Sequence, residues 1–132
     1  MGGSMKAVRV VAAIISDGSR ILATQRGYGD FAGGWEFPGG KIEPGEDPKE
    51  AIVREIQEEL HARIEVERFV CNVVHDYESF RLDMDCFLCH LIDGDITLVE
   101  HRAARWLDFE HIDSVAWLPA DIKVVEALTR ES

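Results

Sequence analysis

The sequence predicts one mixed α/β domain, and two kinds of pattern indicate this fold class. β-branched and apolar runs bounded by turn residues are typical of strands, whereas two stretches carry apolar residues at the three- and four-residue spacing of helices. A chain of 132 residues is long enough for one domain with its own core. No repeat, linker or low-complexity tract divides it, and we interpret residues 1–4 as a cloning remnant ahead of a domain at 5–132.

Strands and turns make up the first part of the predicted domain, and one helix follows them. Asp17-Gly18, between two apolar runs, is a hairpin signal. We expect Gly39 and Gly40 to adopt positive φ and to let the backbone come close to the helix. The predicted order is a strand at 6–16, its partner at 20–25, a glycine-rich surface loop at 27–34, a short strand at 35–37 and a helix at 48–60.

The second part of the chain is predicted to contain three more strands and a C-terminal helix. A turn is expected at Asp93-Gly94. Ile122, Val125 and Leu128 have the apolar spacing of a helix. The predicted elements are strands at 67–75, 80–91 and 104–109 and a helix at 119–129.

The helix at 48–60 has a clear start and two distinct stripes of side chains. Asp47 is a suitable N-cap, Pro48 fits the first helical position, and Glu50 completes an acidic capping box. One apolar stripe is expected to face the core, and a stripe of glutamates lies roughly 120° away from it. The apolar stripe consists of Ile52, Val53, Ile56 and Leu60, and the acidic stripe of Glu55, Glu58 and Glu59.

The three glutamates have a spacing that suits a shared cation. Side chains three and four residues apart on a helix lie within about 5–6 Å at Cβ, where like charges repel one another. Mg²⁺ prefers oxygen ligands of this kind, with Mn²⁺ as a substitute, and a carbonyl of the preceding glycine loop could join them. Zinc is not indicated, because no His/Cys cluster accompanies the glutamates. A solvated helix face is the alternative interpretation.

Overall charge and composition exclude some partners. The net charge of −11 makes duplex DNA or RNA a poor partner, whereas a small phosphorylated substrate remains compatible if metal cations offset the charge. No apolar run approaches the roughly 20 residues of a membrane span, and no signal segment is present. We therefore expect a soluble, cytoplasmic protein without a membrane partner, either a monomer or a homodimer.

The three cysteines do not predict a disulfide framework or a zinc site. Cys86 and Cys89 have CxxC spacing but lie within a predicted strand, where residues three apart point to opposite faces. An odd number of cysteines, with Cys71 as the third, also argues against paired disulfides. We interpret them as core residues.

The segment that contains the helix at 48–60 resembles a motif of a known family. Gly40, five residues, Glu46, seven residues and then Arg54-Glu55-Ile56-Gln57-Glu58-Glu59 match the box of the Nudix hydrolases. Segments outside the box resemble the MutT-like subgroup: Gln25-Arg26, Trp35-Glu36-Phe37-Pro38, Glu100 with Trp106, and Leu118-Pro119-Ala120-Asp121. The resemblance implies an α/β/α sandwich in which a curved mixed sheet lies between helices. The box normally ends in glycine, and His61 stands there instead; His tolerates the left-handed cap that the glycine would form.

The resemblance also implies roles for individual residues. Glu55, Glu58 and Glu59 would bind magnesium together with the Gly40 carbonyl, and Arg54 and Glu46 would hold the glutamates in position. Glu100 would be a further metal ligand or the general base, with a plain loop acid as the alternative. The residues that would bind substrate are Arg26, Glu36, Phe37, Gly39, Lys41, Phe80 and Asp121.

Within that set the expected contacts differ. Arg26 and Lys41 would contact phosphates, with solvated surface cations as the alternative. Asp121 occupies the position that reads the base, and could accept from a cytosine amino group or, when protonated, bond an oxidised purine. Trp35, Phe37 and Phe80 would stack on or flank the base, or else belong to the core.

The activity implied is hydrolysis of a nucleoside triphosphate at the β-phosphorus, which releases nucleoside monophosphate and pyrophosphate. Two substrate interpretations remain open, namely oxidised triphosphates such as 8-oxo-dGTP, and CTP, dCTP or their modified forms. The alternatives are a Nudix hydrolase of ADP-ribose or dinucleoside polyphosphates, a non-catalytic nucleotide-binding Nudix module, and a structural calcium-binding domain. The last lacks the acidic loop spacing of calcium sites.

Overall fold

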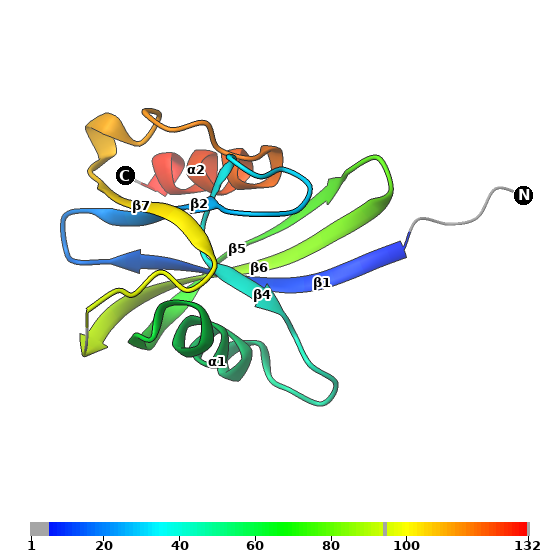
Figure 1. Cartoon of the computed structure of the whole chain (residues 1–132), viewed down its shortest axis with the longest axis horizontal. Helices are drawn as coiled ribbons and strands as arrows, with labels where there is room; N and C mark the ends of the chain where they lie inside the picture. Colours follow the sequence, from blue (N-terminus) through cyan, green and yellow to red (C-terminus); the bar gives the residue numbers. More distant parts are fainter. Residues whose placement is uncertain (1–5, 94, 132) are drawn as a thin grey trace, which may run out of the picture.

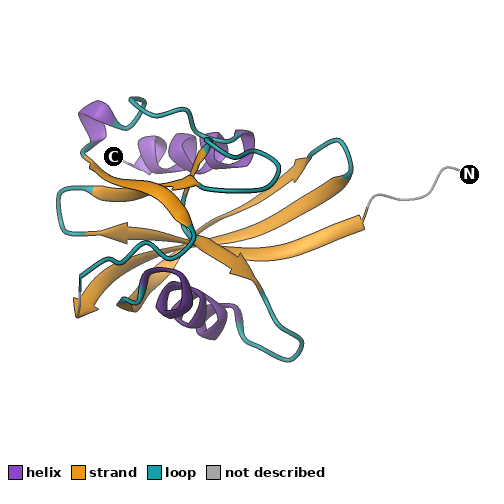
Figure 2. Ribbon diagram, viewed as in Figure 1, coloured by secondary structure: helices purple, strands orange, loops and turns teal. Residues whose placement is uncertain are grey.

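Across residues 6–93 and 95–131, which the computed structural model describes, seven strands form one mixed sheet with a helix on each side (Figures 1 and 2). The predicted cloning remnant at 1–4 and Gly94 of the predicted turn lie outside these residues. The elements are β1 (Lys6–Ser16), β2 (Ile21–Arg26), β3 (Trp35–Glu36), β4 (Gly39–Lys41), α1 (Pro48–Leu60), β5 (Arg63–Asp76), β6 (Phe80–Asp93), β7 (His101–Leu107), the 3-10 turn η1 (Phe109–His111) and α2 (Pro119–Glu131).

The sheet is organised around β1. The strand order is β3-β2-β1-β6-β5, with β4 also paired to β1 and β7 to β2. β1 and β6 run parallel over the whole length of β1, whereas the other pairs are antiparallel. Both α1 and α2 have 13 residues, and neither is long and apolar enough to cross a membrane.

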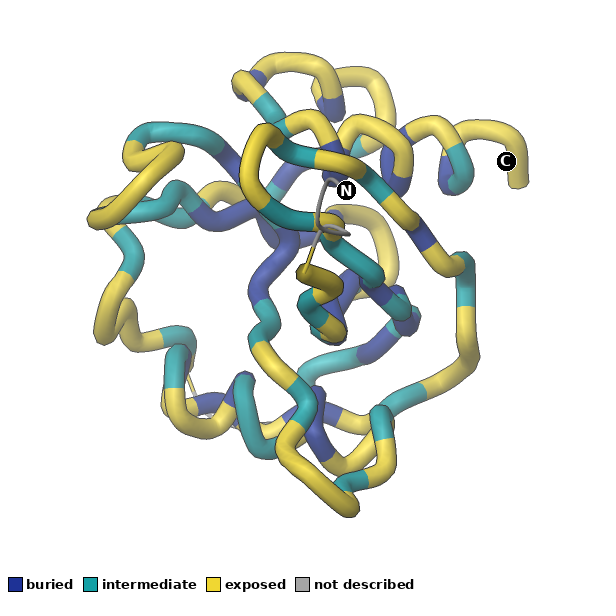
Figure 3. Tube along the Cα trace, turned by 90° about the vertical axis from the view of Figure 1, so that its right-hand side faces the viewer, coloured by how far each residue is buried: buried dark blue, intermediate teal, exposed yellow. Residues whose placement is uncertain are grey.

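Two hydrophobic cores lie on the two faces of the sheet, and β1 contributes to both. Its side chains alternate, so Val11, Ala13 and Ile15 pack with α1, while Ala12 and Ile14 pack with α2. Figure 3 shows the buried segments near the centre of the molecule and the exposed ones around it. The α/β/α layering predicted from the sequence is therefore confirmed.

The predicted bounds and N-cap of α1 are also confirmed, but the prediction that Val53 faces the core is wrong. Asp47 accepts from the Lys49 amide, and Glu50 completes the capping box. Val53 is 40% exposed, and the side chain that is buried instead is Ala51. The buried side of the helix is thus turned toward the row 51–55–59, which brings Glu55 and Glu59 to the edge of the core.

The expectation of positive φ at Gly39 and Gly40 is wrong. Both lie in the unpredicted strand β4, opposite Ala12 and Val11 of β1, and positive φ occurs at other glycines. Their lack of a side chain is needed for a different reason. A Cβ on Gly39 would collide with the Val11 carbonyl oxygen, and one on Gly40 would collide with the Glu55 carboxylate.

Other differences concern the ends of elements. β5 and β6 are longer than predicted because they pair with each other over nearly their full lengths. The predicted strand at 104–109 begins earlier, at His101, and Phe109 lies in η1 instead. Ile122, one of the residues that indicated α2, is 46% exposed.

The cysteine interpretation agrees with the fold. Cys86 lies in the core under α2, and Cys89 in the core under α1, so the two thiols are on opposite faces of β6. Cys71 is half-buried, and all three thiols are free.

His61 forms the left-handed cap that the sequence predicted. Its φ is +50°, and its amide donates to the Gln57 carbonyl at 3.1 Å. The left-handed backbone conformation costs a residue with a side chain roughly 1–2 kcal/mol, and glycine avoids this cost. Glycine also loses more conformational entropy on folding, which offsets part of that gain. We therefore expect His61→Gly to raise the free energy of unfolding by about 0.5–1 kcal/mol in urea titrations, with turnover unchanged. Lower stability would mean that the His61 side chain contributes contacts of its own.

Candidate active site

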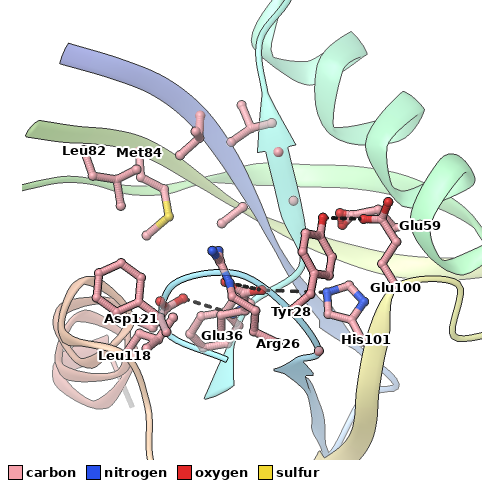
Figure 4. A pocket seen from close by; sticks show the side chains of 18 of the residues that line it. Arg26, Tyr28, Glu36, Glu59, Leu82, Met84, Glu100, His101, Leu118 and Asp121 are labelled. Carbon is pink, nitrogen blue, oxygen red and sulfur yellow. Dashed lines mark hydrogen bonds and ion pairs between the residues drawn. The ribbon is translucent and has the colours of Figure 1, made fainter. Parts of the chain in front are cut away.

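A pocket of about 230 Å³ opens where the middle of β1, β4, β6, the end of α1, the start of β7, the loop 27–34 and the start of α2 meet. Its two ends have different chemistry, as Figure 4 shows. Glu59 and Glu100 lie at one end, here called the acidic end, and Gly39 and Gly40 also line the pocket. The opposite end, here called the Asp121 end, consists of Leu82, Met84, Leu118 and Asp121, and Arg26, Tyr28 and Glu36 lie between the two.

Arg54 connects the acidic side chains of α1 and the loop before it. Its Nη1 donates to Glu55 Oε1 at 2.9 Å and to Glu58 Oε2 at 3.2 Å. Its Nε and Nη2 donate to the two oxygens of Glu46 at 2.7 and 2.9 Å, and Nη2 also donates to the Lys41 carbonyl at 3.1 Å. These bonds lower the pKa of Glu46 to about 2. Arg54 and Glu46 therefore have the contacts that the proposed positioning role requires.

The three helix glutamates have different environments. Glu58 is 59% exposed, whereas the Glu55 carboxylate lies against Gly40 and burial raises its pKa. Glu59 faces the pocket, and burial, together with the charges of Glu55, Glu36 and Glu100, raises its pKa to about 8. In the described part of the chain no three His, Cys, Asp or Glu side chains are arranged closely enough to hold a metal ion. Arg54 supplies the positive charge for Glu55 and Glu58 instead.

The residues present nevertheless fit a hard divalent cation. Glu59 Oε1 is buried and, within the described residues, has no hydrogen-bond partner. Gly40 leaves the Glu55 carboxylate room beside the backbone, which any larger residue would fill. The available donors are carboxylate and carbonyl oxygens, which suit Mg²⁺ or Mn²⁺ better than zinc.

Asp121 is a buried acid at the far end of the pocket. Burial raises its pKa to about 8, although its Oδ1 accepts from the Phe37 amide at 3.0 Å. Phe37 in turn stacks on Trp117 with ring centroids 4.6 Å apart. The carboxyl group is therefore held in one position between the end of β3 and the first turn of α2.

A partly buried cluster of polar side chains lies in the middle of the pocket. Arg26 Nη2 donates to Glu36 Oε1 at 2.7 Å. His101 Nε2 lies 3.8 Å from Glu36 Oε2, and its side chain is 7% exposed. Burial lowers the pKa of His101, and its Nδ1 has no partner among the residues described. His101 was not predicted as a site residue, because a lone histidine in a strand does not indicate a chemical role.

Aromatic side chains form one wall of the pocket. Tyr77 stacks on Phe80 with centroids 5.2 Å apart, and Phe31 lies against Tyr77 at 5.0 Å. The Tyr77 hydroxyl also accepts from the Ala120 amide at 3.2 Å, which ties this wall to α2. Of these residues only Phe80 was predicted. Tyr77 lies in the turn after β5 and Phe31 in the glycine-rich loop, and nothing in the local sequence indicates that the two meet.

Comparison with known proteins identifies the family. The model of the NUDIX domain matches residues 5–128. The chain belongs to the NUDIX family. It is 36% identical over 124 residues to the CTP pyrophosphohydrolase of Escherichia coli (strain K12), covering 93% of this chain and 92% of that protein. It is 33% identical to a putative 8-oxo-dGTP diphosphatase 2 of Mycobacterium tuberculosis (strain ATCC 25618 / H37Rv), with 92% and 87% covered.

Two solved structures are similar to this chain in fold. The solution structure of the E. coli ORF135 protein matches with a TM-score of 0.81 and 36% identity, covering 96% of this chain and 91% of that one. The MutT NUDIX hydrolase from Burkholderia pseudomallei matches with a TM-score of 0.86 and 26% identity, covering 93% and 98%. The predicted family, the hydrolase class and the MutT-like fold are therefore confirmed.

This NUDIX domain brings most of the predicted site residues into one place. The predicted residues that line the pocket are Arg26, Glu36, Phe37, Gly39, Gly40, Glu59, Phe80, Glu100 and Asp121. Lys41 is exposed and does not line the pocket, although its carbonyl accepts from Arg54. Arg54, Glu55 and Glu58 are also not among the residues that line it. Trp35 belongs to a small core with Leu107, so its core interpretation fits the structure.

Proposed function

We propose that the chain is a divalent-metal-dependent nucleoside triphosphate pyrophosphohydrolase that releases nucleoside monophosphate and pyrophosphate. The observation that carries this proposal is the two-ended pocket, in which a glutamate-rich end adjoins the family's box and a buried acid occupies the other end. A base at the Asp121 end and phosphates at the acidic end fit this arrangement. The names of the relatives support the same class of reaction.

The acidic end would hold Mg²⁺, with Mn²⁺ as a substitute. Glu55, Glu58, Glu59 and Glu100 with the Gly40 carbonyl are the proposed ligands, and the orphaned Glu59 Oε1 supports this. When bound, the ion offsets charge on the phosphates and on the pyrophosphate leaving group. Without such charge compensation, the acids of the pocket would repel a triphosphate.

The other proposed roles follow from contacts in the chain. Arg54 orients Glu55 and Glu58, while Glu46 fixes Arg54. Arg26 is the arginine that lines the pocket, and Glu36 fixes its guanidinium between the two ends, where it would meet the phosphates. Glu100 is the proposed further ligand or the base that accepts a proton from the attacking water.

Asp121 would contribute to the choice of base. With a pKa of about 8 it carries a proton at neutral pH, and because Oδ1 accepts from Phe37, Oδ2 is free to donate. Cytosine and oxidised guanine both offer a carbonyl or ring-nitrogen acceptor. We therefore keep CTP or dCTP and 8-oxo-dGTP as the candidate substrates, in agreement with the names of the two relatives.

A substrate panel tests this proposal. We expect 8-oxo-dGTP, dCTP or CTP to be hydrolysed with Mg²⁺, to give pyrophosphate as the first phosphorus product, and to be untouched in EDTA. ADP-ribose should be a poor substrate. Product analysis by phosphorus NMR or coupled assays distinguishes pyrophosphate from orthophosphate, and orthophosphate as the primary product would contradict cleavage at the β-phosphorus. Nucleotide binding without any turnover would favour a non-catalytic module. A cytoplasmic location and a monomeric or dimeric state remain predictions.

A further inference from the structure

Tyr28 connects the glycine-rich loop to Glu100. Its hydroxyl donates to Glu100 Oε2 at 3.1 Å, and the contact spans 72 residues of sequence. Both side chains line the pocket, and Figure 4 shows the phenol reaching the acidic end beside Glu59. The Tyr28 side chain is otherwise exposed, so core packing does not explain its position.

The backbone around Tyr28 is held in place rather than free. The Arg26 amide donates to the Gly34 carbonyl, and the Gly33 amide donates to the Arg26 carbonyl, each at 2.9 Å, which closes the base of the loop. A Cβ on Gly27 would lie 2.5 Å from the Glu100 carbonyl oxygen, so the glycine allows the loop to lie directly on the chain at Glu100. The residue next to this close contact is Tyr28.

The backbone leading to Glu100 is fixed from the other side. The amides of Thr97 and Val99 donate to the carbonyls of Leu60 and Glu59 at 2.9 and 3.3 Å, which ties this segment to the end of α1. Glu100 lies near enough to Glu59 for its charge to raise the pKa of Glu59. Its main chain is therefore held, whereas its exposed carboxylate needs a partner to stay in one orientation. Among the described residues, the hydrogen-bond donor to that carboxylate is Tyr28.

A phenol is a suitable partner for a carboxylate that must also attract a cation. Lysine or arginine would orient Glu100 equally well but would add a positive charge that repels a divalent ion. The neutral hydroxyl occupies one lone-pair direction of Oε2 and leaves Oε1 and the full negative charge available. Partners of this kind orient the carboxylates of metal sites.

We propose that Tyr28 is a positioning residue that orients the Glu100 carboxylate toward the acidic end of the pocket. The loop acts through Glu100 and not through direct contact with the reacting atoms. This inference rests on the proposed function of the pocket, and it assigns to the glycine-rich loop a role in preparing the site for the cation.

A double-mutant cycle tests the proposal with Tyr28→Phe, Glu100→Gln and the double variant. Tyr28→Phe removes only the hydroxyl and keeps the ring. Mn²⁺ binding is measured by electron paramagnetic resonance without nucleotide, and kcat and KM are measured separately with the best substrate. We expect Tyr28→Phe to weaken Mn²⁺ binding by about 5- to 10-fold and to lower kcat by a similar factor, with KM changed less than about two-fold. In the Glu100→Gln background the same change should have no further effect.

Two results would overturn the proposal. One is wild-type Mn²⁺ affinity and kcat in Tyr28→Phe. The other is an equal loss in the Glu100→Gln background, which would mean that Tyr28 acts by another route. Unchanged melting temperatures show that a loss is not caused by unfolding. If no nucleotide is turned over by the wild-type chain, the proposed function fails, but the Mn²⁺ cycle still decides whether Tyr28 and Glu100 are coupled.

Discussion

Replacing Glu58 by glutamine should lower turnover at least about 100-fold while leaving the fold intact. The Glu58 side chain is 59% exposed and accepts a hydrogen bond from Arg54, so its replacement removes little packing. Glutamine keeps the shape and one carbonyl oxygen but loses the negative charge that a divalent ion requires. The measurements are kcat with saturating Mg²⁺ and the free energy of unfolding, which should change by less than about 0.5 kcal/mol.

A matched control for this variant is Glu126→Gln. Glu126 is an exposed acid on α2, with no role in the proposed site, and the change alters net charge by the same amount. It should leave both turnover and stability unchanged. If Glu58→Gln turns over at nearly the wild-type rate, the glutamate row of α1 does not do the chemistry and the central assignment is wrong.

Asp121→Asn should make the protein more stable than the wild type at alkaline pH. The carboxyl is buried, and its pKa is raised from 3.8 to about 8 in the folded state. The pKa of Asp121 is higher in the folded state than in the unfolded state. Its contribution to the free energy of unfolding is therefore fully present below about pH 3.8 and is lost as the pH rises through about 8. Asparagine has no charge to bury, and its oxygen can still accept from the Phe37 amide.

The difference can be measured by urea unfolding at two pH values. Each pKa unit of separation corresponds to about 1.4 kcal/mol. Between about pH 6 and about pH 8, the wild type should therefore lose about 2 kcal/mol relative to the Asn variant. Parallel stability curves for the two proteins would show that Asp121 is ionised in the folded state and would remove the argument that it donates to the base.

The helix α1 was predictable from the sequence because its determinants are local. Asp47, Pro48 and Glu50 lie within four positions of one another and fix the start of the helix without help from the rest of the chain. The spacing of the glutamates likewise belongs to one helix. The helix was therefore predicted correctly, whereas the metal-binding role of its glutamates remains a proposal.

Properties that depend on packing were less predictable. Whether Val53 or Ala51 faces the core is decided by where β1 and β4 lie, and the periodic pattern allows either. Positions 39 and 40 require glycine because a Cβ there would collide with Val11 or Glu55. The prediction had instead explained these glycines by positive φ, which is a local conformational preference. Periodicity describes the helix but not its rotation against the sheet.

The pocket residues that the sequence did not indicate come from segments far apart in the chain. Tyr28 meets Glu100 across 72 residues, and Tyr77 meets Ala120 across 43. Neither tyrosine has a neighbour that marks it as functional. His101 follows a residue that the family resemblance did indicate, yet its burial against Glu36 arises only when β7 pairs with β2.

The two-sided packing of β1 links the shape of the pocket to a single alignment of strands. Shifting β1 by one residue would turn Val11, Ala13 and Ile15 toward α2 and would present the opposite set to α1. The same slip would carry β4 with it, since Gly40 is aligned with Val11, and Gly40 would no longer lie beside Glu55. The pairing of the central strand that fills both cores is thus the same pairing that places Gly40 beside Glu55.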